Sequence, residues 1–390
     1  MRNRIIRYLK HISVTVFFLI IAAVIFGLNI GASLSYAEDS QRMNWHNDGP
    51  YLFYENDSTV VVNYIEGNNN KGFYAEKKKY STNSIIPAKS YFNLDSTSFD
   101  FTIYPKIETP KVVYNDDNKI IAISDIESSY KAFRDFLIAY KVIDQNLNWI
   151  FKQGHLVLVG DFVDRGFSTT QVLWFIYKLE QEAKSKGGTV HFIIGNHELK
   201  NLHGDYASSS PKYKFISSIL GKNQFDLYSK NSVLGKWLAS KNTIELINGI
   251  LFTHGGLHPK IANTNMSLLE INQFIRAHYY RANYPKANKT INDFLISSKE
   301  GICWYRGYFK DDLSQIDVEV GLDKFNAKAI VVGHTLQSKV TTLFNKKVIA
   351  IDVKHPKDYH KNWPTPKSEG LLIDGDLFFR LFDNGKKEEL

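Results

Sequence analysis

The stretch HLVLVGDFVDRG, from His155 to Gly166, joins a short apolar run to a loop of charged side chains. A bounded apolar run of this length favours a buried strand. A helical stretch follows from Ser168 to Gly187, and another apolar run, VHFII, begins at Val190. Alternation of strands and helices predicts an α/β domain built in layers.

The same alternation extends outward from this stretch. KIIAIS (119–124) precedes it, and GILFT (249–253) and KAIVVG (328–333) follow it. Late strand-like runs such as GLLID (370–374) have no helical stretch between them. They predict a second sheet packed on the first, within a domain that we place at residues 116–385.

Residues 38–115 have a different character. Runs of β-forming residues such as STVVVNYI (58–65) and FDFTIY (99–104) are separated by turn sequences such as EGNNNKG (66–72). No cluster of titratable side chains in this region indicates catalysis. We therefore expect a small β-rich extension that acts as a packed module or a lid.

Residues 1–37 predict export. The chain begins with four basic residues and no acidic one: Arg2, Arg4, Arg7 and Lys10. An apolar run (12–30) follows, and then Ser35 and Ala37 fit the −3 and −1 places of a signal-peptide cleavage site. The run also approaches the ~20 residues that span a bilayer, so an uncleaved membrane anchor stays open. Either way the basic end stays in the cytoplasm, and we expect an extracytoplasmic protein: secreted, periplasmic or anchored facing outward.

Composition excludes some classes of function. The 390 residues include one cysteine, Cys303, which excludes an intrachain disulfide and a cysteine-based zinc site. The net charge is +8, but the basic residues form no stripe interleaved with stacking aromatics. We therefore expect no nucleic-acid partner.

Polar side chains directly follow five of the apolar runs. They are Asp125 and Glu127 after IIAIS; Asp161, Asp164 and Arg165 after LVLVG; Asn196, His197 and Glu198 after HFIIG; His254 after ILFT; and His334 after AIVVG. Each motif alone is also typical of a turn or a helix cap. Ligands in layered α/β proteins gather beyond the carboxyl ends of strands, so the set of five predicts one shared site.

The residue types of this set suit metal chemistry. Mixed Asp, Asn and His donors are typical of sites for Mn, Fe, Zn or similar ions rather than of an all-oxygen calcium cage. Two such ions held ~3.5–4 Å apart by a bridging carboxylate acidify a shared water, and the metal-bridging hydroxide attacks phosphorus in line. The set therefore predicts metal-dependent hydrolysis of a phosphate ester without a covalent enzyme intermediate.

Four ordered motifs carry a resemblance to a known family. GDFVDRG (160–166), GNHE (195–198), THGGL (253–257) and GHT (333–335) resemble the calcineurin-like metallophosphoesterase superfamily, in particular its phosphoprotein phosphatase (serine/threonine phosphatase-like) branch. The resemblance covers residues 119–352. It implies a layered metallophosphoesterase β-sandwich flanked by helices, with two divalent ions, Mn first and Fe, Zn or Mg as alternatives.

The resemblance also implies the metal ligands. Asp161 would bridge the two ions, and Asp125 would bind the first ion. Asn196, His254 and His334 would bind the second.

It implies the remaining roles as well. His197 would be the general acid, and Asp164 would hydrogen-bond it and support its charged form. Arg165 would grip the phosphate, and CWYRGY (303–308) supplies a second arginine, Arg306, for the same task.

One motif departs from the family pattern, which is Asp-x-His-Gly. This chain has Asp125-Ile126-Glu127-Ser128 at that place. We expect Glu127 to bind the first ion in place of the histidine, which makes the site harder and favours Mn²⁺, Mg²⁺ or Fe over an ion that prefers nitrogen ligands. The alternative is that Glu127 points away and that the first site is weak or empty.

We therefore expect an exported, metal-dependent phosphatase that hydrolyses phosphomonoesters of a phosphoprotein or a small molecule. Two alternatives stay open. One is a phosphodiesterase of the same superfamily that acts on nucleotides or lipids. The other is a catalytically impaired protein that binds metal or phosphate.

Overall fold

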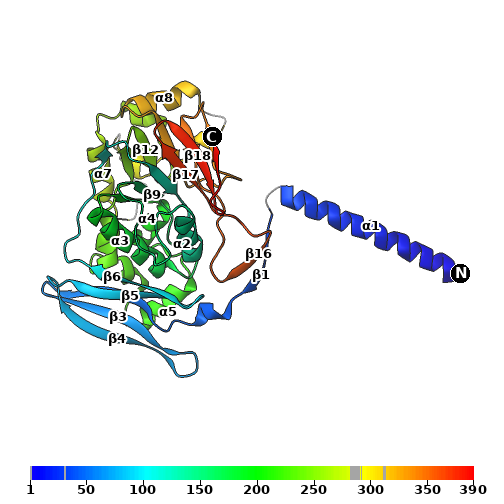
Figure 1. Ribbon diagram of the computed structural model, residues 1–390, viewed down its shortest axis with the longest axis horizontal. Helices are drawn as coiled ribbons and strands as arrows, with labels where there is room; N and C mark the ends of the chain where they lie inside the picture. Colours follow the sequence, from blue (N-terminus) through cyan, green and yellow to red (C-terminus); the bar gives the residue numbers. More distant parts are fainter. Residues whose placement is uncertain (1, 30–31, 282–289, 291, 311–312) are drawn as a thin grey trace.

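Two six-stranded sheets form the centre of the structure (Figure 1). The computed structural model describes residues 2–29, 32–281, 290, 292–310 and 313–390. Met1, Ile30 and Gly31 of the predicted export segment lie outside the described residues, as do residues 282–289, 291 and 311–312 of the predicted main domain.

The first sheet contains the strand that begins the HLVLVGDFVDRG stretch. Its strands in spatial order are β10 (Thr189–Ile193), β9 (His155–Val159), β8 (Ile120–Ile123), β17 (Glu369–Asp374), β18 (Leu377–Phe382) and β19 (Lys387–Glu389). β8, β9 and β10 are parallel, so their carboxyl ends meet at one edge.

The second sheet supplies the other strand ends. Its strands in spatial order are β14 (Thr341–Leu343), β15 (Val348–Ala350), β13 (Ala329–Val332), β12 (Ile250–Thr253), β11 (Ile244–Ile247) and β7 (Val113–Tyr114). β12, β13 and β15 are parallel to one another.

The side-chain alternation of the strands explains the layers. Ala122 and Val159 of the first sheet share a buried cluster with Phe252 and Ile349 of the second. The alternate residues, Leu156 among them, pack in a second cluster with residues of the helices. The predicted α/β sandwich flanked by helices is confirmed.

Seven α-helices follow α1 along the described part of the chain. They are α2 (Tyr130–Ala139), α3 (Thr169–Ser185), α4 (Asn196–His203), α5 (Pro211–Ile219), α6 (Val233–Ala239), α7 (Leu268–Arg276) and α8 (Gln315–Asp323). α2 and α3 lie beside the first sheet, and α7 and α8 lie beside the second (Figure 1).

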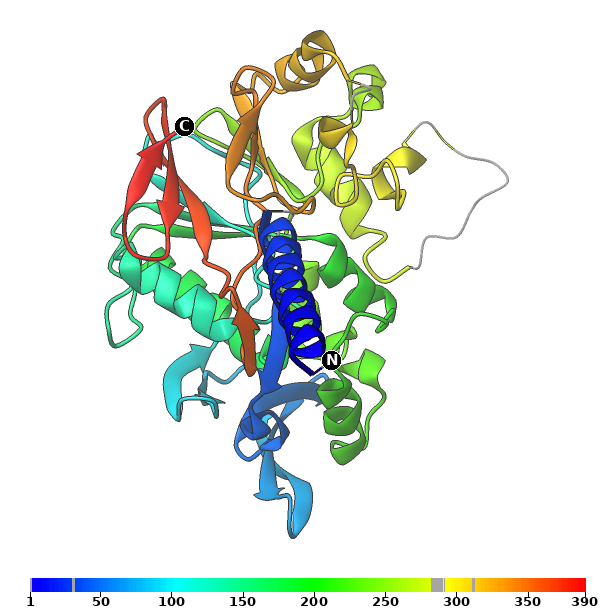
Figure 2. The same cartoon turned by 90° about the vertical axis from the view of Figure 1, so that its right-hand side faces the viewer.

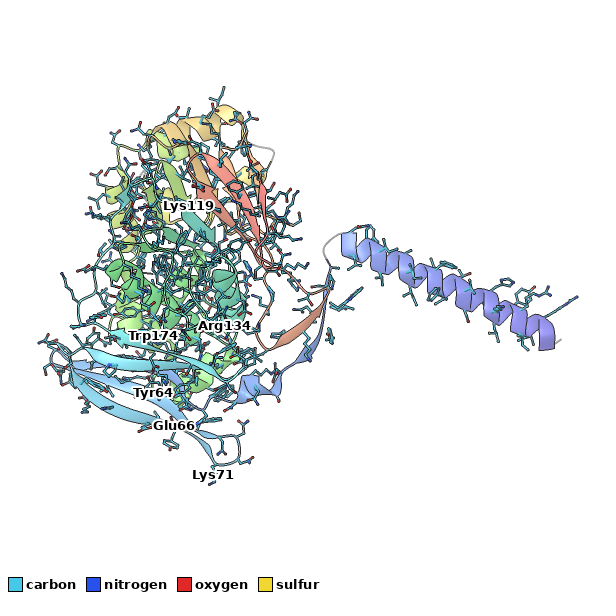
Figure 3. All side chains as sticks on the ribbon, in the orientation of Figure 1. Tyr64, Glu66, Lys71, Lys119, Arg134 and Trp174 are labelled. Carbon is cyan, nitrogen blue, oxygen red and sulfur yellow. The ribbon has the colours of Figure 1, made fainter. Side chains whose placement is uncertain are left out.

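The N-terminal strands form a three-stranded sheet and a hairpin that pack on α3, α5 and α6. They are β2 (Asp48–Asn56), β3 (Thr59–Asn68), β4 (Gly72–Ser81), β5 (Ile86–Phe92) and β6 (Thr97–Ile103). Trp174 of α3, labelled in Figure 3, donates its indole N–H to the Pro50 carbonyl at 2.8 Å. Buried Lys212 of α5 pairs with Asp48 at 2.7 Å. These buried polar contacts fix the extension to the helices.

The chain start stands apart from this body. α1 (Arg2–Asn29) projects away from the sheets in Figure 1, and its candidate membrane span, Arg4–Asn29, contains an 18-residue window with a mean hydropathy of 2.5 and no buried residue. β1 (Leu34–Glu38) follows and pairs with β16 (His360–Trp363) as a separate two-stranded ribbon.

Candidate metal centre

The five polar strand ends meet at one edge of the sandwich. Asp125 follows β8, Asp161 follows β9, Asn196 begins α4 after β10, His254 follows β12, and His334 follows β13. All five residues are buried. The convergence that the sequence predicted is therefore present in the fold.

Asp161 lies at the centre of the hydrogen bonds. Its Oδ2 is 3.1 Å from Nε2 of His254, and its Oδ1 accepts the backbone N–H of His197 at 2.9 Å. Nε2 of His254 is also 3.0 Å from Oδ1 of Asn196. Nδ1 of His254 lies 2.8 Å from the Val159 carbonyl, so it is Nε2 that faces the other donors.

Gly160 makes this approach possible. Its φ is +79°, and a Cβ there would lie 2.6 Å from Nδ1 of His254 and 2.7 Å from Cα of Gly195. The neighbouring backbone is left-handed too, with φ near +53° at Asp125, +58° at Asp161 and +66° at His334. Such conformations are uncommon outside glycine and cluster at functional sites.

Glu198 holds the loop of Asp161 in place, a role that sequence reasoning missed. Its carboxylate is fully buried and accepts the backbone N–H groups of Asp161 and Gly195 at 2.9 Å each and of Phe162 at 2.9 Å. The GNHE motif could have predicted this role. It places Glu198 at the third position of a helix that begins at Asn196, which is the position of the glutamate in a capping box.

His197 is held by a chain of two side chains. Its Nδ1 lies 2.8 Å from Oδ2 of Asp164, and Asn201 donates its amide to Oδ1 of Asp164 at 2.8 Å. Burial opposes the charged ring, but the bonded Asp164 and nearby Asp161 together raise the pKa of His197. Asn201, one turn later on α4, had no sequence signal of its own.

The electrostatics favour a bound cation. Among the described residues, Asp161, His254 and His334 offer ligand atoms that all lie within 4.8 Å of one another. Burial opposes a charged His254, yet Asp161 and Asp125 raise its pKa to about 10. Burial, together with nearby His254 and Arg306, lowers the pKa of His334 to about 2, so its ring is neutral. Clustered carboxylates and a neutral imidazole are ligands that divalent transition metals prefer.

A further carboxyl joins this cluster from a late loop. Asp352 follows β15 and is buried. Burial, with the charge of Asp125 second, raises the pKa of Asp352 to about 9, and burial with nearby Asp161 raises the pKa of Asp125 to about 7. Closely placed buried carboxyls of this kind lose their mutual repulsion when a cation binds between them.

Glu127, the expected replacement for the histidine ligand, is paired with two cationic side chains. One carboxylate oxygen accepts a hydrogen bond from Nη1 of Arg165, and the other accepts one from Nζ of Lys357. Metal binding by Glu127 stays a prediction. Lys357 lies in the loop between β15 and β16, and nothing in the sequence singled out this lysine.

The two expected phosphate-binding arginines both border the cluster. Nη2 of Arg165 lies 3.1 Å from Nε2 of His197. Arg306 donates from Nη1 to the His334 carbonyl at 2.5 Å and to Oγ1 of Thr335 at 3.1 Å. The site thus gathers carboxylates and imidazoles at its floor and guanidinium groups at its rim. The individual roles of these residues stay predictions.

Comparison with known proteins gives consistent findings. A family model described as calcineurin-like phosphoesterase matches residues 118–338. Shewanella-like protein phosphatase 1 of Plasmodium berghei is 31% identical over 262 residues, which cover 63% of this chain and 67% of that protein. Shewanella-like protein phosphatase 2 of Arabidopsis thaliana is 22% identical over 282 residues, covering 60% and 71%. A crystal structure of a cold-active protein-tyrosine phosphatase of a psychrophilic Shewanella species is 30% identical, with a TM-score of 0.76, covering 88% of this chain and 99% of that one.

Proposed function

The chain belongs to the calcineurin-like phosphoesterase family, and from this premise we propose that it is an exported phosphatase that removes phosphate from phosphoprotein side chains, phosphotyrosine included. Membership makes it a hydrolase of phosphoric esters that uses divalent metal ions. The phosphomonoester specificity, the manganese preference and the location outside the cytoplasm belong to the proposal.

The residues at the floor of the site fit the metals that the family implies. Asp161, His254, His334 and Asn196 would hold one ion, and Asp161 with Asp125 would hold the other. When bound, the ions supply an activated water and neutralise charge on the phosphoryl oxygens. His254 and Asp161 keep their donor atoms facing one another through the Val159 carbonyl and the backbone N–H of His197.

The rim residues would bind and orient the substrate. Arg165 and Arg306 would each pair with phosphate oxygens, since a guanidinium fork matches them bidentately. A monoester dianion gains from two such cations more than a diester monoanion does. This supports monoesters over diesters.

The observation that carries the proposal is the placement of His197. Asp164 fixes its Nδ1, so its Nε2 points to the site, 3.1 Å from Arg165 and 3.8 Å from Oδ2 of Asp161. A phosphate held by Arg165 would bring its leaving oxygen within reach of this nitrogen. A protein that merely bound metal or phosphate would not need an oriented proton donor.

The substrate class rests on the comparisons. The Shewanella structure that covers 88% of this chain is titled a protein-tyrosine phosphatase, and the Plasmodium and Arabidopsis relatives carry protein phosphatase names. The location rests on α1, whose basic start and apolar body have the order of an export signal or anchor.

The test uses the full chain in detergent, stripped of metal and refilled with Mn²⁺. We expect turnover of p-nitrophenyl phosphate and of a phosphotyrosine peptide, and little turnover of bis(p-nitrophenyl) phosphate. Preference for the diester would replace the proposal with phosphodiesterase activity. Failure to turn over any ester with any divalent ion would leave a binding protein.

A further inference from the structure

The strand that follows the apolar helix is joined to the folded body through β16. β1 pairs with β16 in an antiparallel ladder that sets Leu34 opposite Trp363. The contact continues where the backbone N–H of Asp39 donates to the Tyr359 carbonyl at 2.9 Å. Figure 1 shows β1 and β16 side by side between α1 and the sandwich, and in Figure 2, seen from the side of α1, the two strands again lie next to each other.

This ladder conflicts with removal of the helix as a signal peptide. Cleavage after Ala37, the expected place, would remove residues 34–37 of the five-residue strand Leu34–Glu38. β16 would then lose the strand that satisfies its backbone. The pairing therefore favours a chain that keeps its helix as an anchor.

The ribbon exposes large apolar side chains beside the end of that helix. Leu34 is 68% exposed, Tyr36 is 67% exposed and Trp363 is 51% exposed. Leu34 and Trp363 are cross-strand partners, so their side chains lie on one face of the ribbon. Tyrosine and tryptophan next to an apolar span are typical of the membrane–water interface.

Chain length keeps the ribbon at the lipid surface. The span Arg4–Asn29 has 26 residues, or about 39 Å of helix, against a hydrocarbon core of about 30 Å. Five peptide steps separate Asn29 from Leu34, so these two residues lie at most about 18 Å apart. An embedded helix therefore brings Leu34 to the interface.

The same ribbon leads directly to the candidate metal centre. Lys357, whose ammonium pairs with Glu127, lies three residues before β16 begins. Glu127 in turn accepts a hydrogen bond from Arg165 at the rim of the site. A few residues thus connect the strand next to the lipid to the phosphate-binding side of the site.

We propose that the β1–β16 ribbon is a seat on the lipid bilayer: β1 stays in the mature chain, and Leu34, Tyr36 and Trp363 rest at the membrane surface. The seat holds the Lys357 side of the site close to the lipid, so phosphoproteins at the same membrane surface are the substrates within reach. The lipid contact does not depend on the proposed function; the choice of phosphoprotein substrates rests on the phosphatase activity proposed above.

Two measurements on the full chain test whether β1 is retained and paired. The intact mass of the protein extracted from membranes should include residues 1–37; a chain that starts at Glu38 would overturn the proposal. The double variant Ser35→Cys with Asn362→Cys, which are ladder partners, should form a disulfide on mild oxidation. The control pair Ser35→Cys with Asp376→Cys, on the β17–β18 turn, should not. The native Cys303 is buried and does not interfere.

Contact with lipid is tested by fluorescence in phosphatidylcholine vesicles with or without brominated acyl chains. Bromine should quench part of the tryptophan emission of the native chain, and Trp363→Phe should remove that quenching. Trp45→Phe, in which a buried ring is replaced, should retain it. Equal quenching of the native chain and the Trp363 variant would overturn the seat.

Turnover of p-nitrophenyl phosphate by the same preparations separates the two proposals. Trp363→Phe should hydrolyse this soluble substrate at the native rate. A lipid contact without turnover would refute the proposed function alone, and turnover without a lipid contact would refute the seat alone.

Discussion

Replacing Gly160 with alanine tests the close approach on which the metal centre depends. The new Cβ would lie 2.6 Å from Nδ1 of His254 and 2.7 Å from Cα of Gly195, while φ is +79°. The left-handed backbone costs about 1–2 kcal/mol with a side chain, and overpacking costs about 1–3 kcal/mol more. We expect the free energy of unfolding to fall by about 2–5 kcal/mol and the metal content to fall with it, because His254 must move.

The chain contains a matched control for this variant. Gly221 has a φ of +67°, and a Cβ there would meet nothing within 4 Å. Gly221→Ala therefore carries the backbone cost of Gly160→Ala without the steric one, and it should keep its metal. Urea unfolding in detergent gives the stabilities, and elemental analysis gives the metal content. Equal stability and equal metal content in the two variants would refute the close packing of His254 against Gly160.

Four further results are expected. Asp161→Asn should lower metal content and turnover together, because it weakens the donor that both ions would share; full activity by the p-nitrophenyl phosphate assay would remove Asp161 from that role. His197→Ala should keep its metal by elemental analysis and lose about 10²–10⁴ in kcat for esters with poor leaving groups, but much less for p-nitrophenyl phosphate; equal losses would exclude a general acid. Lys357→Met leaves the Glu127 carboxylate to Arg165 alone, so KM for monoesters should rise about tenfold with a smaller change in kcat; steady-state kinetics with an unchanged KM would contradict this. Chelation should lower the free energy of unfolding by about 3–4 kcal/mol when the ion was present at 100–1,000 times its Kd, and added Mn²⁺ should restore it; unfolding curves insensitive to chelator would argue against bound metal.

Sequence by itself determined the parts of this protein whose physics is local. The strands of the sandwich follow from short apolar runs such as LVLV in β9, and α3 was predicted over nearly its full length. Strands with an exposed face were harder: β4 carries three consecutive lysines on an edge of its sheet, so no apolar alternation marks it. The convergence of the polar strand ends was also predictable from the sequence, because parallel strands place their carboxyl ends at one edge of a sheet.

The tertiary structure alone decided which distant groups share that edge. Lys357 reaches Glu127 from 230 residues away, and the direction of the Glu127 carboxylate depends on that partner. β1 and β16 are polar or mixed in sequence and become strands by pairing with each other across the whole chain. Long-range pairing of this kind leaves no periodic signal, because neither partner carries its own apolar face; the fold supplies the neighbour that makes each of them a strand.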